Sequence, residues 1–198
     1  MSSVKIGITG SIGMGKTKTA SFFLEKGIPV WDADKSVNQL YKRGESGYEA
    51  IKKISRSFVN NHQVDKPKLL KEISANSDLL KQIESKIHPL VRKSRFDFIE
   101  NNKMAPILVF DIPLLFESSD YKWLDKIIVV TVNVKEQEAR VLKRGKMTRE
   151  QFLELNSKQM PIEEKIKLAD YVIQTDFGLL QAKRQVSKII NRVLQKNE

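Results

Sequence analysis

Short apolar runs alternate along this chain with longer amphipathic stretches. Five runs have the length and composition of strands, at residues 4–9, 28–31, 107–110, 126–132 and 171–174. Because these runs are continuously apolar, they indicate strands buried on both faces of a parallel sheet. Helical stretches separate them, which is typical of an α/β fold with three layers and about five parallel strands.

The segment between the second and third strands has a different pattern. From about residue 35 to 103, apolar residues recur at helical spacing, as at Leu69, Leu70, Ile73, Leu79, Leu80, Ile83 and Ile87. We expect one domain, residues 1–198, with an inserted helical subdomain at about 35–103. That subdomain could cover a substrate or serve only as scaffold. A charge-rich helical stretch follows at 135–168, and an amphipathic helix at 179–195 comes last.

A glycine-rich loop follows the first strand. Residues 10–17 read G-S-I-G-M-G-K-T and fit G-x-x-x-x-G-K-[ST], the phosphate-binding P-loop, with a predicted helix at 19–26 closed by Gly27. Loop amides and the positive end of the helix dipole would bind the phosphates of ATP. We expect Lys16 to reach the β- and γ-phosphates and the Thr17 hydroxyl to bind Mg²⁺. The residues expected to contact the nucleotide are Ser11, Ile12, Gly13, Met14, Gly15, Lys16, Thr17 and Lys18.

Three aspartates stand at predicted strand ends. Asp111 closes the strand at 107–110, where a Walker B carboxylate would bind Mg²⁺. Asp32 and Asp34 follow the second strand, at the edge of the sheet where open α/β folds bind ligands. A carboxylate there can accept the proton of a hydroxyl that is being phosphorylated, and Asp34 is the better candidate. The alternative is a structural role for each, as a turn or helix N-cap.

Arginines recur on the helical stretch after the fourth strand. Arg140 and Arg144 stand four residues apart, and therefore on one helix face, with Arg149 beyond them. Arginines on a mobile lid would neutralise charge on a transferring phosphoryl group and exclude water. The alternative is a solvated helix face with ion pairs to Glu136, Glu138 and Glu150.

His88 precedes Pro89 within the helical segment. Proline disfavours the helical conformation for the residue before it, so we expect His88 to lie at a helix boundary in extended geometry. Its imidazole could bind a ribose or phosphate oxygen, and a structural role is equally compatible with the sequence.

Composition narrows the class of protein. The chain has no cysteine, which excludes disulfides and thiolate metal sites, and no apolar run approaches the roughly 20 residues of a membrane span. We expect a cytoplasmic protein, a monomer, without a membrane partner. The formal charge of +11 could indicate nucleic-acid binding, but the lysines are dispersed and form no basic arm, so no nucleic-acid partner is expected.

Several motifs together resemble the dephospho-CoA kinase family. Besides the P-loop, these are Asp32-Ala33-Asp34, Ile87-His88-Pro89, the run Asp111-Ile112-Pro113-Leu114-Leu115-Phe116-Glu117, and Ala169-Asp170-Tyr171-Val172-Ile173. They occur in the family's order, and the resemblance extends from about residue 4 to about 190.

The resemblance implies phosphorylation of the 3′-hydroxyl of the dephospho-CoA ribose by ATP and Mg²⁺. It further implies a helical substrate domain within 35–103 and a lid at about 135–165. The second aspartate of the D-A-D motif would be catalytic (Asp34), the lid arginine would be Arg140, and Gln159 would match a polar family position. Lys16, from the P-loop pattern, and Arg144, from the helix face, complete the expected catalytic residues. Residues expected on the acceptor side are Asp32, His88, Pro89, Pro113, Leu114, Leu115 and Glu117.

The chain departs from the family pattern at three places. Lys66 and Lys165 stand where arginine is usual or frequent, and Thr175-Asp176-Phe177-Gly178 replaces the usual asparagine-glycine. Lysine keeps the charge but cannot form a bidentate contact with phosphate. These changes affect details of binding, and none removes a predicted catalytic residue.

Three other functions fit parts of the sequence. Another P-loop kinase, acting on a nucleoside or nucleoside monophosphate, would share the loop and the arginines. A GTPase switch would carry Asn-Lys-x-Asp and Asp-x-x-Gly motifs, which are absent. A nucleic-acid-binding protein would bind with an affinity that falls steeply with salt.

Overall fold

The structure, a computed structural model, describes residues 3–118, 121–145 and 147–195. The chain divides into two compact units, one formed by residues 1–31 and 102–198 and the other by residues 32–101. Each has its own secondary structure and its own apolar core.

The first unit is built on the sheet. Its strand order is β2-β3-β1-β4-β5, and β1 pairs in parallel with both β3 and β4, as β4 does with β5. This register places Ile8 of β1 opposite Asp111 of β3, so the carboxyl ends of these strands share one edge. The predicted α/β fold with five strands is confirmed. The strands are β1 (Val4–Thr9), β2 (Val30–Asp32), β3 (Ile107–Asp111), β4 (Lys126–Thr131) and β5 (Tyr171–Gln174).

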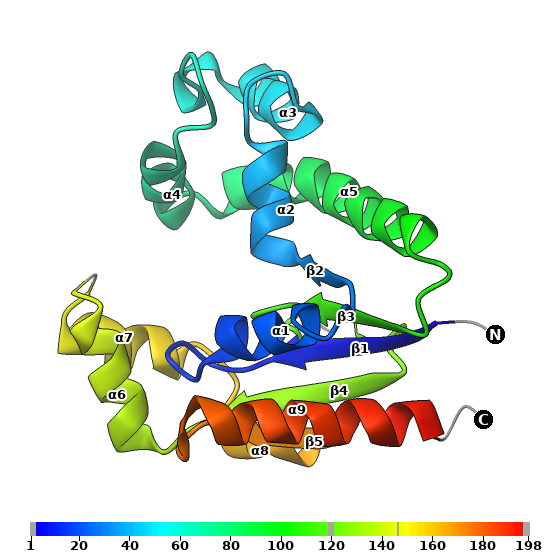
Figure 1. The fold of residues 1–198 in the computed structure, drawn as a ribbon. Coiled ribbons are helices and arrows are strands. Elements are labelled where there is room, and N and C mark those ends of the chain that lie inside the picture. Colours follow the sequence, from blue (N-terminus) through cyan, green and yellow to red (C-terminus); the bar gives the residue numbers. More distant parts are fainter. Residues whose placement is uncertain (1–2, 119–120, 146, 196–198) are drawn as a thin grey trace. The chain divides into compact units, whose positions relative to one another are not determined.

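Both faces of this sheet are covered. Helices α1 (Lys16–Leu24) and α9 (Gly178–Gln195) pack on one face (Figure 1). Ile128 and Val130 belong to the apolar core on that face. Ile127 and Val129 point to the opposite face, against the segment after β3 and residues next to α8 (Ile162–Lys167). This alternation explains why the run at 126–132 is apolar at nearly every position.

Two further helices follow β4, in the region predicted as a lid. They are α6 (Val134–Lys143) and α7 (Arg149–Ser157). The Asn133 side chain caps α6 by accepting a hydrogen bond from the Glu136 amide at 2.9 Å. Thr148 and Gln151 form a capping box at the start of α7.

The second unit is helical. It contains α2 (Ala33–Leu40), α3 (Ser46–Ile54), the 3₁₀ turn η1 (Arg56–Phe58), α4 (Lys66–Ala75) and α5 (Ser77–Asn101). Two isolated antiparallel bridges, Lys42 with Gln63 and Val59 with Val64, are its only β pairings among the described residues apart from Asp32 at the end of β2. Its core is formed by Tyr41, Tyr48, Ile51, Phe58, Val64, Leu69, Ile83 and Ile87.

Three element boundaries differ from those the sequence predicts. Strand β2 begins at Val30 and not at residue 28, since Pro29 has no amide hydrogen to donate. Helix α1 begins at Lys16 and not at residue 19, because Gly15 adopts a left-handed conformation (φ 93°) and the helix starts directly after it. Strand β4 ends at Thr131 instead of 132.

The prediction that Pro89 marks a helix boundary is wrong. Helix α5 is 25 residues long and continues without a break through Pro89, so His88 is helical and not extended. Apolar residues on both sides of the proline, Ile83 and Ile87 before it and Leu90 after it, pack into the core of the second unit. This shared packing outweighs the lost hydrogen bond and the ring clash of an interior proline, which together cost about 3 kcal/mol.

No helix in residues 3–118, 121–145 and 147–195 combines the length and the apolar composition needed to cross a membrane.

We predict that Pro89→Ala stabilises α5. Pro89 is exposed, so the substitution leaves no cavity and lets the residue 89 amide bond to the carbonyl one turn earlier. The expected gain is about 1–3 kcal/mol in the free energy of unfolding, measured by urea denaturation and by slower hydrogen exchange of α5 amides. Pro67→Ala is the matched control, because Pro67 lies in the first turn of α4, where no helical hydrogen bond is lost, and its effect should be smaller. A loss of stability in Pro89→Ala would contradict the prediction.

Candidate functional site

The P-loop joins β1 to α1 and depends on glycine at two positions. Gly13 and Gly15 have φ of 82° and 93°, a conformation that other residues rarely adopt. A Cβ on Gly13 would lie 2.6 Å from Val141 of α6, so the loop packs directly on that helix. The first amides of α1 have no partner within the helix, and together with the helix dipole they favour an anion.

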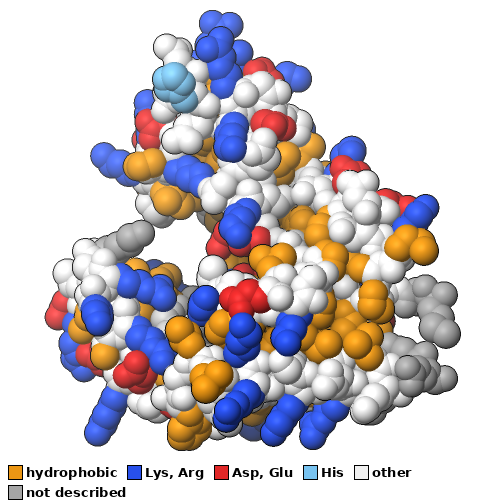
Figure 2. All heavy atoms as spheres, viewed as in Figure 1, with side chains coloured by type: hydrophobic (Ala, Val, Ile, Leu, Met, Phe, Trp, Pro, Cys, Tyr) orange, Lys and Arg blue, Asp and Glu red, His pale blue; other side chains and the backbone are white. Residues whose placement is uncertain are grey.

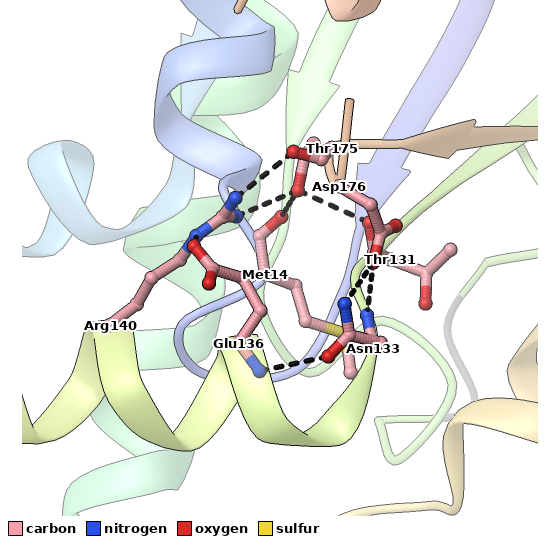
Figure 3. A network of polar contacts seen from close by, with 7 residues as sticks. All are labelled: Met14, Thr131, Asn133, Glu136, Arg140, Thr175 and Asp176. Carbon is pink, nitrogen blue, oxygen red and sulfur yellow. Dashed lines mark hydrogen bonds and ion pairs between the residues drawn. The ribbon is translucent and has the colours of Figure 1, made fainter. Parts of the chain in front are cut away.

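Hydrogen bonds hold this loop from behind. The buried side-chain amide of Gln137, in α6, donates to the Ile12 carbonyl at 2.8 Å. The buried Thr175 hydroxyl contacts the Met14 carbonyl at 3.0 Å (Figure 3). Carbonyl oxygens carry partial negative charge and would repel a phosphate. Two of them are thus engaged by hydrogen-bond donors of the protein.

The P-loop lysine forms an ion pair with the aspartate at the end of β3. Lys16 Nζ contacts Asp111 Oδ1, and the side chains are only 14% and 3% exposed. Each charge is costly to bury alone, and together they are neutralised. The two predicted phosphate- and metal-site residues therefore lie in contact, with Thr17 next to Lys16 in the first turn of α1.

Arg140 of α6 reaches the segment after β5. Its Nη1 donates to the Thr175 hydroxyl at 2.8 Å and its Nη2 to the Thr175 carbonyl at 3.0 Å, while Nε pairs with Glu136 at 2.9 Å (Figure 3). The Thr175 hydroxyl thus lies between the arginine and the P-loop carbonyl of Met14. The ion pair between Arg140 and Glu136, which belongs to the alternative prediction of a solvated helix face, is present together with the contact to Thr175.

Asp176 fixes the start of α6. It accepts hydrogen bonds from the backbone and side-chain amides of Asn133 at 2.7 and 2.6 Å (Figure 3). Burial opposes its ionisation, but these hydrogen bonds and the charge of Arg140 hold the pKa of Asp176 below its usual value. Thr175 and Asp176, which lie in the segment that departs from the family pattern, therefore both contact α6 or its cap: Asp176 binds Asn133 and Thr175 binds Arg140.

A pocket of about 270 Å³ lies beside the P-loop in this unit. Gly15 and Phe22 line it from the loop and α1, Arg140 and Thr175 from one side, and Leu179 of α9 from another. Lys18 also lines the pocket, whose mostly apolar walls with two cationic side chains suit a flat heteroaromatic ring.

Glu117 has a structural partner. Its carboxylate pairs with Lys165 Nζ at 2.8 Å and accepts a hydrogen bond from the Met160 amide at 3.0 Å. The Lys165 side chain is completely buried. Burial opposes ionisation of Glu117, but the Lys165 ammonium and the Met160 amide lower its pKa overall. Glu117, which we expected on the acceptor side, and Lys165, which we expected to affect binding, thus pair with each other.

The other predicted residues of this unit are spread over several segments. Leu115 is buried on the sheet, Leu114 is exposed, and the Pro113 carbonyl accepts a hydrogen bond from the Thr9 hydroxyl at 3.0 Å. Arg144 occupies the C-cap position of α6, and Arg149 pairs with Glu138 at 2.6 Å.

The remaining predicted residues belong to the second unit. The Asp32 side chain caps α2 by accepting a hydrogen bond from the Lys35 amide at 2.9 Å, which is the structural alternative considered for it. Asp34 lies in the first turn of α2, while His88 and Pro89 are exposed on α5. Lys66 pairs with Asn38 within the same unit.

Sequence reasoning did not identify four residues that shape the loop: Asn133, Gln137, Thr175 and Asp176. Gln137 could have been found, since it lies four residues before the buried Val141 and therefore on the buried face of α6. Nothing in the local sequence indicates that Thr175 contacts both Arg140 and Met14.

A family model described as "Dephospho-CoA kinase" matches residues 4–181. Among curated relatives, a dephospho-CoA kinase of Ruegeria pomeroyi is 41% identical over 189 residues, covering 96% of this chain and 95% of its own. One from Bartonella quintana is 40% identical over 192 residues, covering 96% and 98%.

Solved structures are similar over nearly the whole chain. A protein from Thermus thermophilus has a TM-score of 0.85 at 29% identity, covering 97% of this chain and 98% of its own. A dephospho-CoA kinase from Campylobacter jejuni has a TM-score of 0.70 at 24% identity, covering 98% of each, and supports the fold.

We predict that Lys165→Met destabilises the first unit. The substitution leaves Glu117 charged and mostly buried without its partner, since the glutamate side chain is 21% exposed. Removing one member of such a pair should cost about 2–4 kcal/mol in the free energy of unfolding, measured by urea denaturation at pH 7. Lys165→Arg keeps the charge and is the matched control.

Two further measurements separate the charge effect from packing. Adding Glu117→Gln to Lys165→Met should recover much of the loss, because no buried charge is then unpaired. The pKa of Glu117 is lowered in the folded state, so the stability gained from the pair is present above the ordinary glutamate pKa and is lost as the pH falls through the lowered value. Equal stability of Lys165→Met and the parent at pH 7 would contradict the assigned role.

Proposed function

This chain belongs to the dephospho-CoA kinase family, and we propose how its residues carry out that family's reaction: transfer of the γ-phosphoryl group of ATP to the 3′-hydroxyl of the dephospho-CoA ribose, which yields CoA and ADP. The observation that carries the proposal is the P-loop itself, with its carbonyls engaged from behind and Lys16 next to the Asp111 carboxylate. This arrangement is built to bind a polyphosphate and to neutralise charge on it.

ATP would bind with its phosphates on residues 11–18. The loop amides and the first turn of α1 would donate hydrogen bonds to the β- and γ-phosphates. In the free protein the Lys16 ammonium is neutralised by Asp111, and the phosphates offer it a second anionic partner. The pocket lined by Phe22, Arg140 and Leu179 is the proposed place for the nucleoside part of ATP.

Mg²⁺ fits the residues at the end of β3 and the start of α1. The Asp111 carboxylate and the Thr17 hydroxyl are oxygen donors of the kind this ion prefers. Among the described residues no cluster of three acidic or histidine side chains could hold a metal, which fits an ion that takes most of its ligands from phosphates and water. When bound, the ion would neutralise charge on the β- and γ-phosphates.

Asp34 is the proposed general base. Its carboxylate would accept the proton of the 3′-hydroxyl as the oxygen bonds to phosphorus and the bond to the leaving ADP breaks. The neighbouring Asp32 is engaged as the cap of α2, which leaves Asp34 as the carboxylate of this motif without a capping role.

Arg140 and Arg144 are proposed to stabilise the transferring phosphoryl group, with α6 and α7 acting as a lid. Arg140 is supported by its position beside Gly15, whose added Cβ would lie 3.7 Å from the guanidinium. His88, Pro89 and residues 113–115 are proposed to contact the acceptor, a role that rests on the resemblance to the family. The monomeric state and the cytoplasmic location remain predictions.

A substrate panel tests the function. ATP consumption with Mg²⁺ is measured with dephospho-CoA, adenosine, AMP or no acceptor, and mass spectrometry locates the added phosphate. Turnover with dephospho-CoA alone, giving CoA, is the expected result. Turnover with AMP or adenosine instead would favour another P-loop kinase and overturn the proposed acceptor.

We predict that Asp34→Asn lowers kcat by about 10²- to 10⁴-fold, the usual contribution of a general base, and leaves the unfolding transition nearly unchanged. Asp32→Asn is the matched control, because asparagine also caps helices and this variant should retain far more activity. A near-normal rate for Asp34→Asn would disprove the assignment of the base.

A further inference from the structure

One buried hydroxyl in the first unit has no hydrogen-bond partner. Thr19, in α1, is 1% exposed, and its Oγ1 is buried and contacts no donor or acceptor in the part of the chain that the structure describes. A helical threonine hydroxyl commonly bonds to the carbonyl one turn earlier, but here the Gly15 carbonyl accepts the Thr19 amide, at 3.0 Å, and not the Thr19 hydroxyl. An unpaired buried hydroxyl is costly and therefore rare in native proteins.

The buried threonines nearby are satisfied. The Thr9 hydroxyl, in a residue that is also fully buried, donates to the Pro113 carbonyl at 3.0 Å. The Thr175 hydroxyl accepts a hydrogen bond from Arg140 and contacts the Met14 carbonyl. Burial in this region is thus compatible with full pairing, and Thr19 differs from its neighbours.

Thr19 also lines the pocket beside the P-loop. The pocket begins at Gly15, and Thr19 and Phe22 follow it along α1, with Arg140 and Leu179 on other sides. The pocket is therefore contiguous with the residues proposed to bind the phosphates. Its walls are mostly apolar, so a polar group placed among them would contribute to orientation and specificity more than to burial.

We propose that the Thr19 hydroxyl forms a hydrogen bond with the nucleoside part of the donor nucleotide, a bond that exists only when the nucleotide is bound. This inference rests on the proposed function, since it takes the pocket's ligand to be the nucleoside of ATP or ADP. A hydroxyl both donates and accepts, so its partner can be a base nitrogen or a ribose hydroxyl.

The proposal predicts that removing the Thr19 hydroxyl preserves or raises the stability of the free protein and lowers its affinity for the nucleotide. In the free protein the unpaired hydroxyl opposes folding, so replacing it with a methyl group of similar shape should not destabilise the chain. In the complex the same replacement removes a hydrogen bond to the ligand. A threonine with a purely structural role would show the reverse.

The test is Thr19→Val, with ADP as the probe and no acceptor present. Isothermal titration calorimetry should show ADP binding weakened about 3- to 15-fold, as expected for one hydrogen bond. The melting temperature of the nucleotide-free variant should equal or exceed that of the parent. Thr19→Ser, which keeps the hydroxyl, should bind ADP much more tightly than Thr19→Val.

Thr9→Val is the matched control for the stability measurement. It removes a hydroxyl that has a partner and leaves the Pro113 carbonyl unpaired, so its melting temperature should fall. Two analogues identify the ligand atom: 2′-deoxy-ADP lacks one ribose hydroxyl, and the diphosphate of purine riboside lacks the 6-amino group. The effect of Thr19→Val should disappear with the analogue that lacks the partner of Thr19, and persistence with both would assign the partner to another atom of the nucleoside.

Two results would overturn the inference. Parent-like ADP affinity in Thr19→Val, while the parent binds ADP, would show that the hydroxyl makes no bond to the nucleotide and would leave the proposed function intact. A lowered melting temperature of the nucleotide-free variant would show that the hydroxyl has a structural partner. Failure of the parent itself to bind ADP would instead remove the proposed function, and the inference with it.

Discussion

The orientation of two carbonyl groups in the P-loop is the constraint on which the site depends. Gln137 and Thr175 engage the carbonyls of Ile12 and Met14, and they come from α6 and from the segment after β5. A loop of glycines has little conformational preference of its own, so without these bonds it could turn its carbonyl dipoles toward an anion. The binding loop is therefore a product of tertiary structure as much as of its own sequence.

Lysines in the interior of the first unit are paired with carboxylates, whereas positive charge is in excess at the surface of the protein. Lys165 is buried and the Lys16 side chain is 14% exposed, and each pairs with a carboxylate from a distant segment, Glu117 and Asp111 respectively. The surplus behind the formal charge of +11 lies at the surface, where lysine and arginine side chains are scattered over the face shown in Figure 2 and do not form one patch.

The sequence predicts the features that depend on local pattern, and misses those that depend on packing between segments. Apolar runs located the five strands, and the glycine spacing located the loop. Pro89 was misjudged because the core contacts of Ile87 and Leu90 override a local preference. Glu117 was assigned to the acceptor side, and only its folded neighbourhood shows Lys165 and Met160 as its partners. The role of Thr175 depends on its contacts with Arg140, which lies 35 positions away in the sequence, and with Met14, which lies 161 positions away.

The contact between Arg140 and Thr175 also bears on turnover. In the free protein the guanidinium already has three hydrogen bonds, to Glu136 and to the hydroxyl and carbonyl of Thr175. Any ligand that recruits Arg140 must compete with these bonds, so its apparent affinity is reduced by their free energy. In the proposed reaction the same competition would favour release of ADP, because the guanidinium has partners to return to, and weaker binding of ADP would limit inhibition by the product.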